Sequence, residues 1–308
     1  DFLVLKGLKI NYINSNDENS DIRKFIDQLN STEIDKIQCI DPEDNWLEKR
    51  LRESSKKKGI DLVLLENPAF INTKKDLDPF FRTDKKKLYQ TSFYKAERNR
   101  LHILLDGINT PQGGKWTYDD QNREKYPKDK TTPKINFPKK TKNHQEALLY
   151  VENNFKNNNG ALSDDPLYPT DFETAENWFN DFLKTRFKEF GPYEDAMTSD
   201  NWALHHSLLS PYINNGLLHP SEVVDAAVKR FEKGDIPIAS AEGFIRQIIG
   251  WREYVNGMYW YLGEDYKEGN HLNAKRDLLP LFTDPDKTKM NCIKTTVSDI
   301  NQRAWVAH

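Results

Sequence analysis

Two serines near the middle of the chain have the spacing and context of an anion-binding turn. Ser207 and Ser210 are three residues apart, so they lie on one face of a helical turn. Ser210 precedes Pro211, and this pair is typical of a helix start, in which serine caps the helix and proline supplies the first helical φ. Hydroxyls, free N–H groups and the helix dipole at such a start attract phosphate. The alternative is a capped turn within a helical core.

A second stretch, residues 240–262, predicts a helix in which aromatic and charged side chains alternate. Gln247 precedes Trp251 by one helical turn, so we expect both side chains to face the same cavity. A glutamine there can donate and accept hydrogen bonds but cannot ionise. Arg252 is suited to pairing with a phosphate or a carboxylate, and a structural ion pair with Glu253 or another neighbour is the alternative.

Composition excludes several classes of protein. The chain has 308 residues, enough for two domains, and its net charge of −3 indicates no particular partner. Its hydrophobic content of 37% is sufficient for folded cores. Cys39 and Cys292 are too few and too far apart for a disulfide scaffold, which suits a reducing cytoplasm. There is no apolar run of membrane-spanning length and no visible signal peptide, so we expect a cytoplasmic protein without membrane attachment.

The first part of the chain alternates predicted strands with predicted helices. The strands are expected at residues 8–14, 36–40 and 61–65, and the helices at 21–29 and 45–58. This alternation indicates a parallel sheet with helices on both faces. Later segments are predicted to be helical at 85–105, 144–155, 172–187 and 221–232, the last capped by Ser221. Between them, the Pro- and Lys-rich residues 124–145 predict a solvated connector, with contact to nucleic-acid phosphate as the alternative.

Three of these stretches resemble the photolyase and cryptochrome family. Ser-Leu-Leu-Ser-Pro-Tyr (207–212) resembles the family's flavin-phosphate segment, and Gly-Trp-Arg-Glu-Tyr (250–254) resembles the helix that closes over the flavin and faces the damaged base. Asp-Gly-Ile-Asn-Thr-Pro-Gln-Gly-Gly-Lys-Trp (106–116) is similar to a segment of the iron–sulfur branch of bacterial cryptochromes and photolyases, the photolyase-related proteins. The resemblance covers nearly the whole chain. By comparison with the family, we expect the first strand and the C-terminal part to be missing.

The resemblance implies an α/β N-terminal domain with a parallel, Rossmann-like sheet and an incomplete, all-α C-terminal domain that binds FAD. It places an antenna-type domain at residues 1–105, an interdomain linker at 106–170 and the helical FAD-binding domain at 171–308. A lumazine or other antenna chromophore would belong to the first domain. We assign no residues to it, because part of that pocket is expected to be missing.

The resemblance also assigns site residues. Those implied to bind FAD are Tyr193, His206, Ser207, Leu208, Leu209, Ser210, Phe244, Gln247, Trp251 and Arg252. Gln247 is further implied to hydrogen-bond the lesion, and His308 to donate a proton to it, since the pKa of histidine lies near neutrality. Ordinary core packing is the alternative for Phe244 and Trp251. Asp284 stands where relatives often carry a tryptophan on the electron path to the flavin, which puts that path in doubt.

Cys292 resembles the first cysteine ligand of the branch's [4Fe–4S] cluster. Such a cluster needs four thiolates, and this chain has two cysteines. We therefore expect the other three ligands beyond His308. The alternative for Cys292 is a small buried hydrophobic residue.

The implied function is light-driven repair of UV-damaged DNA. Reduced FAD would transfer an electron to a pyrimidine photoproduct, with the (6-4) type preferred, after the lesion has flipped out of the duplex. This makes the expected protein a monomeric photolyase-like lyase. Two alternatives remain at this point: a cryptochrome-type blue-light photoreceptor without repair, and a non-enzymatic helical module that binds nucleic acid.

Overall fold

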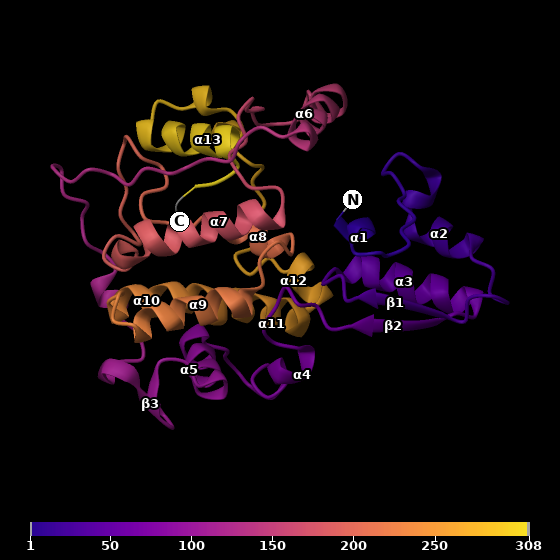
Figure 1. Ribbon diagram of the computed structural model, residues 1–308, viewed down its shortest axis with the longest axis horizontal. Helices are drawn as coiled ribbons and strands as arrows, with labels where there is room; N and C mark the ends of the chain where they lie inside the picture. The colour runs from indigo at the N-terminus through magenta and orange to yellow at the C-terminus, as the bar shows by residue number, and fades with distance from the viewer. Residues whose placement is uncertain (1, 307–308) are drawn as a thin grey trace. The chain divides into compact units, whose positions relative to one another are not determined.

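The computed structural model describes residues 2–306, which divide into a smaller unit up to Pro68 and a larger unit from Ala69 (Figure 1). The smaller unit combines a parallel two-stranded sheet with helices. Its elements are α1 (Phe2–Leu5), the 3₁₀ turn η1 (Glu18–Ser20), α2 (Ile22–Gln28), β1 (Lys36–Ile40), α3 (Asn45–Lys58) and β2 (Asp61–Leu65). The two strands pair in register from Lys36 opposite Asp61 to Ile40 opposite Leu65.

Helix α3 begins and ends where its sequence dictates. The side chain of Asp44 accepts a hydrogen bond from the backbone N–H of Leu47, which satisfies one of the unpaired donors at the helix start. Gly59 ends the helix in the left-handed conformation, with φ of 71°, which glycine adopts without steric cost. Both boundaries and both strands lie where the sequence predicts them.

The strand predicted at residues 8–14 is wrong. No strand forms there, and these residues are exposed. Alternation of apolar and polar residues favours a strand only when a neighbouring strand and a core accept its apolar face. In the described part of the chain this segment has neither, because the sheet of β1 and β2 has no third strand.

The larger unit is mainly helical. Its helices are α4 (Lys74–Leu77), α5 (Gln90–Leu101), α6 (Lys142–Phe155), α7 (Phe172–Thr185), α8 (Ser210–Asn214), α9 (Pro220–Glu232), α10 (Ile238–Ile245), the π-helix η5 (Arg246–Arg252), α11 (Glu253–Leu262), α12 (Glu264–Glu268) and α13 (Asn291–Arg303). A two-stranded antiparallel pair, β3 (Leu105–Gly107) and β4 (Thr110–Pro111), follows α5. The 3₁₀ turns are η2 (Gln112–Gly114), η3 (Asp119–Gln121), η4 (Phe187–Glu189), η6 (Pro280–Phe282) and η7 (Pro285–Lys287).

Two predicted helix caps are wrong. Helix α9 begins at Pro220, and its capping position is His219, so Ser221 lies inside the helix and caps nothing. Helix α8 likewise includes Ser210 as its first residue, with Leu209 at the capping position and no side-chain capping bond. In both helices the proline sets the start, because its fixed φ and missing N–H suit the first helical turn.

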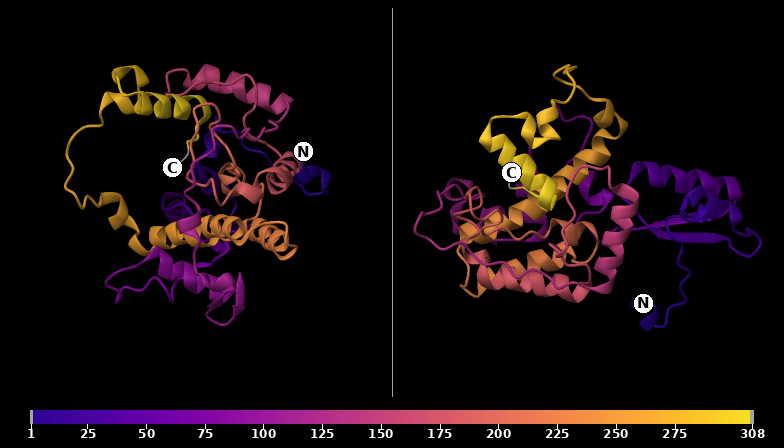
Figure 2. Two further views of the ribbon diagram at one scale, coloured as in Figure 1. Left: turned by 90° about the vertical axis from the view of Figure 1, so that its left-hand side faces the viewer. Right: turned by 90° about the horizontal axis from the view of Figure 1, so that it is seen from above.

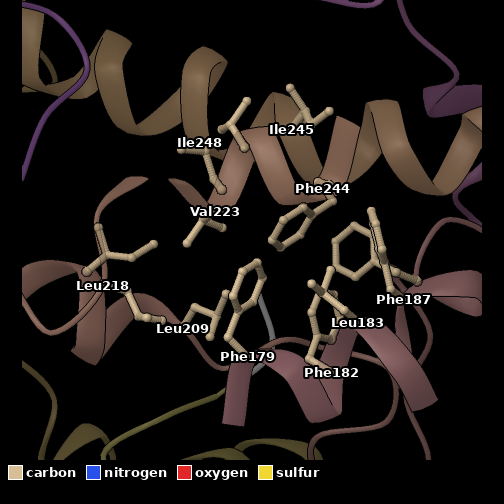
Figure 3. Packing of buried hydrophobic residues seen from close by; sticks show 14 of the residues in the cluster. Phe179, Phe182, Leu183, Phe187, Leu209, Leu218, Val223, Phe244, Ile245 and Ile248 are labelled. Carbon is tan, nitrogen blue, oxygen red and sulfur yellow. The ribbon is translucent and has the colours of Figure 1, made fainter. Parts of the chain in front are cut away.

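Helices α10, η5 and α11 form one continuous run that organises the larger unit. Helix α5 lies along one side of this run and α7 on the other (Figure 1, Figure 2). The core between α7, α9 and α10 is apolar and rich in phenylalanine (Figure 3). The run therefore presents different residues to α5, to the core and to solvent, and it carries Phe244, Gln247, Trp251 and Arg252 of the predicted site.

Candidate functional site

The serine turn and the aromatic helix lie next to each other in the structure. Arg252, at the end of η5, donates a hydrogen bond of 3.1 Å from Nη2 to Oδ1 of Asn214, at the end of α8. The same guanidinium lies over the ring of Phe70 at 4.0 Å, and its Nη1 is 4.0 Å from the Glu253 carboxylate. Arg252 thus connects the aromatic helix to the end of α8, the helix that begins at Ser210, and its contact with Glu253 is the longer one.

Buried side chains of Trp178 and Arg186 bind the backbone carbonyls of the turn that carries the serines. The Ser207 carbonyl accepts a bond of 2.9 Å from the indole N–H of Trp178, and the His206 carbonyl accepts one of 2.6 Å from Nη1 of Arg186. Leu208 is buried and adopts a positive φ of 59°. These two bonds use the carbonyl oxygens of the turn and leave the serine hydroxyls uninvolved.

Neither serine hydroxyl of this turn hydrogen-bonds within residues 2–306, and neither is enclosed. Ser207 is half-buried and Ser210 is exposed. Leu209 between them is buried in the core. The ring of His206 packs edge-on against Trp305, with centroids 5.4 Å apart. Each of these hydroxyls can donate one hydrogen bond to an anionic ligand.

Arg186 adds positive charge beneath the same turn. Its side chain is fully buried between the rings of Trp178 and Phe182, and burial lowers its pKa to about 10. Its Nη2 lies 3.8 Å from the Asp181 carboxylate. Neither Nη2 nor Nε has a hydrogen-bond partner in the described chain. The group stays charged at neutral pH, so the turn has a cation below it.

Phe244 and Trp251, both assigned to flavin contact, have different surroundings. The Phe244 ring points into the core, with Phe182 at 5.1 Å and Phe187 at 5.3 Å between ring centroids (Figure 3). Core packing accounts for this position, and its contact with flavin stays a prediction. Trp251 is 45% exposed and touches Tyr254 edge-on, so core packing does not explain it.

Gln247 belongs to a buried polar group that the sequence did not predict. Its Nε2 donates to Oε1 of Glu194 at 2.6 Å, and Nδ2 of Asn122 donates to Oε2 of the same carboxyl at 2.5 Å. Arg246 lies 3.7 Å from that oxygen, and its Nε is 3.1 Å from Oε1 of Glu242. We call Asn122, Glu194, Glu242, Arg246 and Gln247 the Glu194 cluster.

Burial dominates the electrostatics of the Glu194 cluster. It raises the pKa of Glu194 from its usual 4.5 to about 7, although the Arg246 charge and the Asn122 hydrogen bond oppose the rise. The second carboxylate, Glu242, accepts a backbone bond of 2.9 Å from Tyr118. Tyr118 and Asn122 belong to the stretch following residues 106–116, which served as a family marker without a chemical role. No periodicity or spacing in the sequence indicates that this stretch meets Glu194.

Tyr193, the residue before Glu194, is covered by the linker. Its ring packs edge-on against Tyr126 at 4.8 Å, and it lies 5.6 Å from the His205 ring. The ammonium of Lys130 lies 4.6 Å above its centroid and pairs with the Glu189 carboxylate. Tyr126 and Lys130 therefore anchor the predicted linker to Tyr193 and Glu189. Flavin contact by Tyr193 stays a prediction.

The described residues do not fit an iron–sulfur cluster. Cys292 is exposed near the start of α13, and Cys39 lies in β1 of the smaller unit. Within residues 2–306 no three His, Cys, Asp or Glu side chains are grouped to hold a metal. Cys292 as a cluster ligand thus stays a prediction, and His308 lies outside the described residues. Asp284 caps η7 by accepting from the N–H of Asp286 at 3.0 Å.

Among residues 2–306, no helix combines the length and the apolar character that crossing a membrane requires.

The fold and site define a mixed α/β protein with a small parallel sheet and a helical region, which contains a turn with two serines and a buried carboxyl–amide cluster. Residues 1–166 match the family model of the deoxyribodipyrimidine photo-lyase-related proteins, and the chain belongs to this family. It is 31% identical over 310 residues to a (6-4) photolyase of Agrobacterium fabrum, a match that covers 98% of this chain and 60% of that protein.

Two uncharacterized proteins of Acanthamoeba polyphaga mimivirus are similar over shorter stretches. R853 is 36% identical over 85 residues, which is 27% of this chain and 65% of that protein. R852 is 33% identical over 130 residues, which is 41% of this chain and 65% of that protein. The chain spans about three fifths of the length of the photolyase it matches.

Proposed function

We propose that this chain carries the flavin-phosphate and lesion-facing parts of a light-driven DNA-repair photolyase, with (6-4) pyrimidine photoproducts as substrate. The observation that carries the proposal is the contact between the serine turn and the aromatic helix through Arg252 and Asn214. The family and the similarity to a (6-4) photolyase support the class of reaction. We further propose residues 1–105 as the antenna-type domain, 106–170 as the linker and 171–308 as the FAD-binding domain.

The serine turn supplies what a diphosphate requires. The hydroxyls of Ser207 and Ser210 would donate to phosphate oxygens, and the buried Arg186 beneath them would offset part of the negative charge. Arg252 is held by Asn214 at the end of the short helix α8 that begins at Ser210, and its guanidinium would approach the same oxygens. Bound FAD would supply the electron that splits the photoproduct.

Two residues of η5 would form the face toward the lesion. Trp251 offers a large, exposed aromatic surface on which an extrahelical base can stack. Gln247 offers one half-exposed amide whose orientation the Glu194 carboxyl fixes. These roles need no group that ionises in direct contact with the base.

Paired serine variants test the proposal. We expect the purified protein to show a flavin absorption spectrum, and illumination with a (6-4) oligonucleotide to restore the original bases. Ser207→Ala combined with Ser210→Ala should reduce flavin affinity about tenfold, because two charge-assisted hydrogen bonds are lost. Ser221→Ala is the matched control, since that exposed serine lies in α9 and makes no capping bond.

The outcomes separate the alternatives. Flavin binding without any change in the lesion would favour the photoreceptor. A colourless protein that binds DNA would favour the non-enzymatic module. Flavin affinity unchanged in the double serine variant would contradict the role of the turn.

A further inference from the structure

The side-chain amide of Gln247 has a defined orientation. Its nitrogen donates to Oε1 of Glu194 at 2.6 Å and lies 3.4 Å from the backbone carbonyl of Gly243. Both amide hydrogens therefore have an acceptor on the protein side. The amide oxygen of this half-buried residue receives no hydrogen bond from any described residue and is not enclosed. Gln247 thus presents an acceptor, not a donor, outward.

The Glu194 carboxyl is fixed in turn by its surroundings. Asn122 donates to Oε2 at 2.5 Å, on the side opposite the bond to Gln247. Gly243 makes the close approach possible, since a Cβ atom there would lie 3.0 Å from Oε2 and 2.5 Å from the Asn122 amide. The side chain is 95% buried. It therefore has little freedom to release Gln247 by rotating away.

The protonation state of this carboxyl decides which way the amide can point. An ionised carboxylate only accepts hydrogen bonds, so Gln247 must turn its nitrogen inward. A protonated carboxyl also carries an O–H donor, so the amide can turn over, accept that hydrogen and present its nitrogen outward. The change between the two orientations moves one proton between Glu194 and solvent and rotates the Gln247 amide. No covalent bond of Gln247 is broken.

We propose that Glu194 is a positioning residue that, when ionised, holds the Gln247 oxygen toward the ligand, so that the site selects a base with an N–H donor such as a pyrimidine imide. The identity of the ligand rests on the proposed function, whereas the orientation of Gln247 does not. On protonation of Glu194 the preference for an N–H donor is lost.

The charged groups around Glu194 set when this change occurs. Arg246 from η5 favours the ionised form, and the Asn122 amide does so by hydrogen bonding. Burial is the largest influence and favours protonation of Glu194. The negative charges of Glu242, in α10, and of Asp195, the next residue in the chain, act in the same direction. With the pKa raised to about 7, both orientations are accessible between about pH 6 and about pH 8.

Nuclear magnetic resonance of the side-chain amides tests the positioning without any ligand. In protein labelled with ¹⁵N-glutamine, the Gln247 signal is the one absent from Gln247→Leu. We expect its shift to titrate with a midpoint near 7 in the wild type and to stay constant in Glu194→Gln. Asp195→Asn is the matched control, which keeps the titration with a slightly lower midpoint. A Gln247 signal that does not titrate, or that titrates equally in Glu194→Gln, overturns the proposal.

Binding of modified DNA tests the selectivity. The probes are oligonucleotides that carry a thymine photoproduct with its imide N–H intact or replaced by N-methyl. At about pH 8 we expect the wild type to prefer the intact imide about tenfold, and Glu194→Gln to prefer it less than about twofold. Lowering the pH to about 6 should reduce the preference of the wild type itself, which needs no variant to fold.

The amide titration and the DNA-binding measurement can fail independently of each other. Wild-type protein that binds neither oligonucleotide sinks the proposed function and leaves the amide titration as the test of positioning. Wild-type protein that prefers the imide equally at both pH values, with Glu194→Gln behaving identically, overturns the selectivity.

Discussion

Glu253, within the α10–η5–α11 run, and Glu194, beside it, are both buried glutamates, and they hold different sets of donors. Glu253, the first residue of α11, accepts from the backbone N–H groups of Ile71 and Asn72, each at 3.0 Å, and from the Asn72 amide at 2.9 Å. Glu194 accepts from two side-chain amides, those of Asn122 and Gln247. Burial raises the pKa of both carboxyls.

The two carboxyls differ in whether a change in their protonation can alter a side chain at the surface of the site. Two of the three donors to Glu253 are backbone N–H groups, which have no alternative orientation, and the third, the Asn72 amide, is buried, so a change in Glu253 acts on residues 71–72 and does not reach the surface. Side-chain amides can turn over, and Gln247 is half-buried, so a change in Glu194 reaches the surface of the site. Both residues are buried glutamates, and the exposure of the amides that they hold separates a structural carboxyl from one that can control a ligand contact.

Removing the carboxyl of Glu253 should have the largest effect on stability. Glu253→Leu leaves three donors, two of them buried and one half-buried, without an acceptor, so we expect the free energy of unfolding to fall by about 3–5 kcal/mol. Glu253→Gln keeps one acceptor oxygen and should lose about half as much. Urea unfolding measures both variants. Glu232→Gln is the control, because that exposed residue at the end of α9 has no buried partner.

A loss below about 1 kcal/mol in Glu253→Leu would mean that these donors find other acceptors. The two glutamates would then no longer differ in the way described.

Local signals in the sequence predict part of this structure. Strands β1 and β2 and helix α3 form where the pattern places them, because alternating or periodic apolar residues coincide with an N-cap at Asp44 and a left-handed Gly59. Residues 8–14 show a similar alternation and form no strand, since no described segment pairs with them. A pattern becomes an element only when something else in the fold accepts its apolar face.

The candidate site is predicted less completely, for a physical reason. The motifs place Gln247, Trp251 and Arg252 on one helical segment, which the structure contains as the π-helix η5. They give no sign of Glu194, because its bond to Gln247 joins residues far apart in the chain and depends on how the loop after η4 packs. At Ser210 the sequence predicts too much. The local pattern predicts a side-chain cap, but Ser210 is the first residue of α8 and makes no capping bond, and Pro211 favours the helix start instead.

The pH dependence of stability should report the raised pKa of Glu194. Between about pH 4.5 and about 7 the unfolded chain ionises this glutamate while the folded chain keeps its proton, so stability falls as the pH rises through this range. We expect the wild type to lose about 1–3 kcal/mol more than Glu194→Gln over this interval, because the variant has no group to ionise there. Urea unfolding at a series of pH values gives the difference between the two. Parallel curves for the two proteins would show that the cluster does not perturb Glu194.

Gly243→Ala should change stability least and still separate the two glutamates. Its new Cβ would meet the Asn122 amide at 2.5 Å, a flexible side chain that can move, and alanine favours the helix by about 1 kcal/mol. These effects oppose each other, so we expect a net change within about 1 kcal/mol. Displacing Asn122 removes a hydrogen bond that lowers the pKa of Glu194, so the titration of Gln247 should move to higher pH.

Gly257→Ala is the matched variant beside Glu253. There the Cβ would lie 2.0–2.7 Å from the Phe81 ring, which is packed against Phe93 and Tyr254 and cannot yield as easily. We expect a loss of about 1–3 kcal/mol with no change in the Gln247 titration. A Gln247 titration that moves in Gly257→Ala and not in Gly243→Ala would reverse the roles given to the two glutamates. It would place control of the Gln247 amide at the α11 end of the run, because Glu253, whose only amide partner is the buried Asn72 among the described residues, would then be the carboxyl that acts on it.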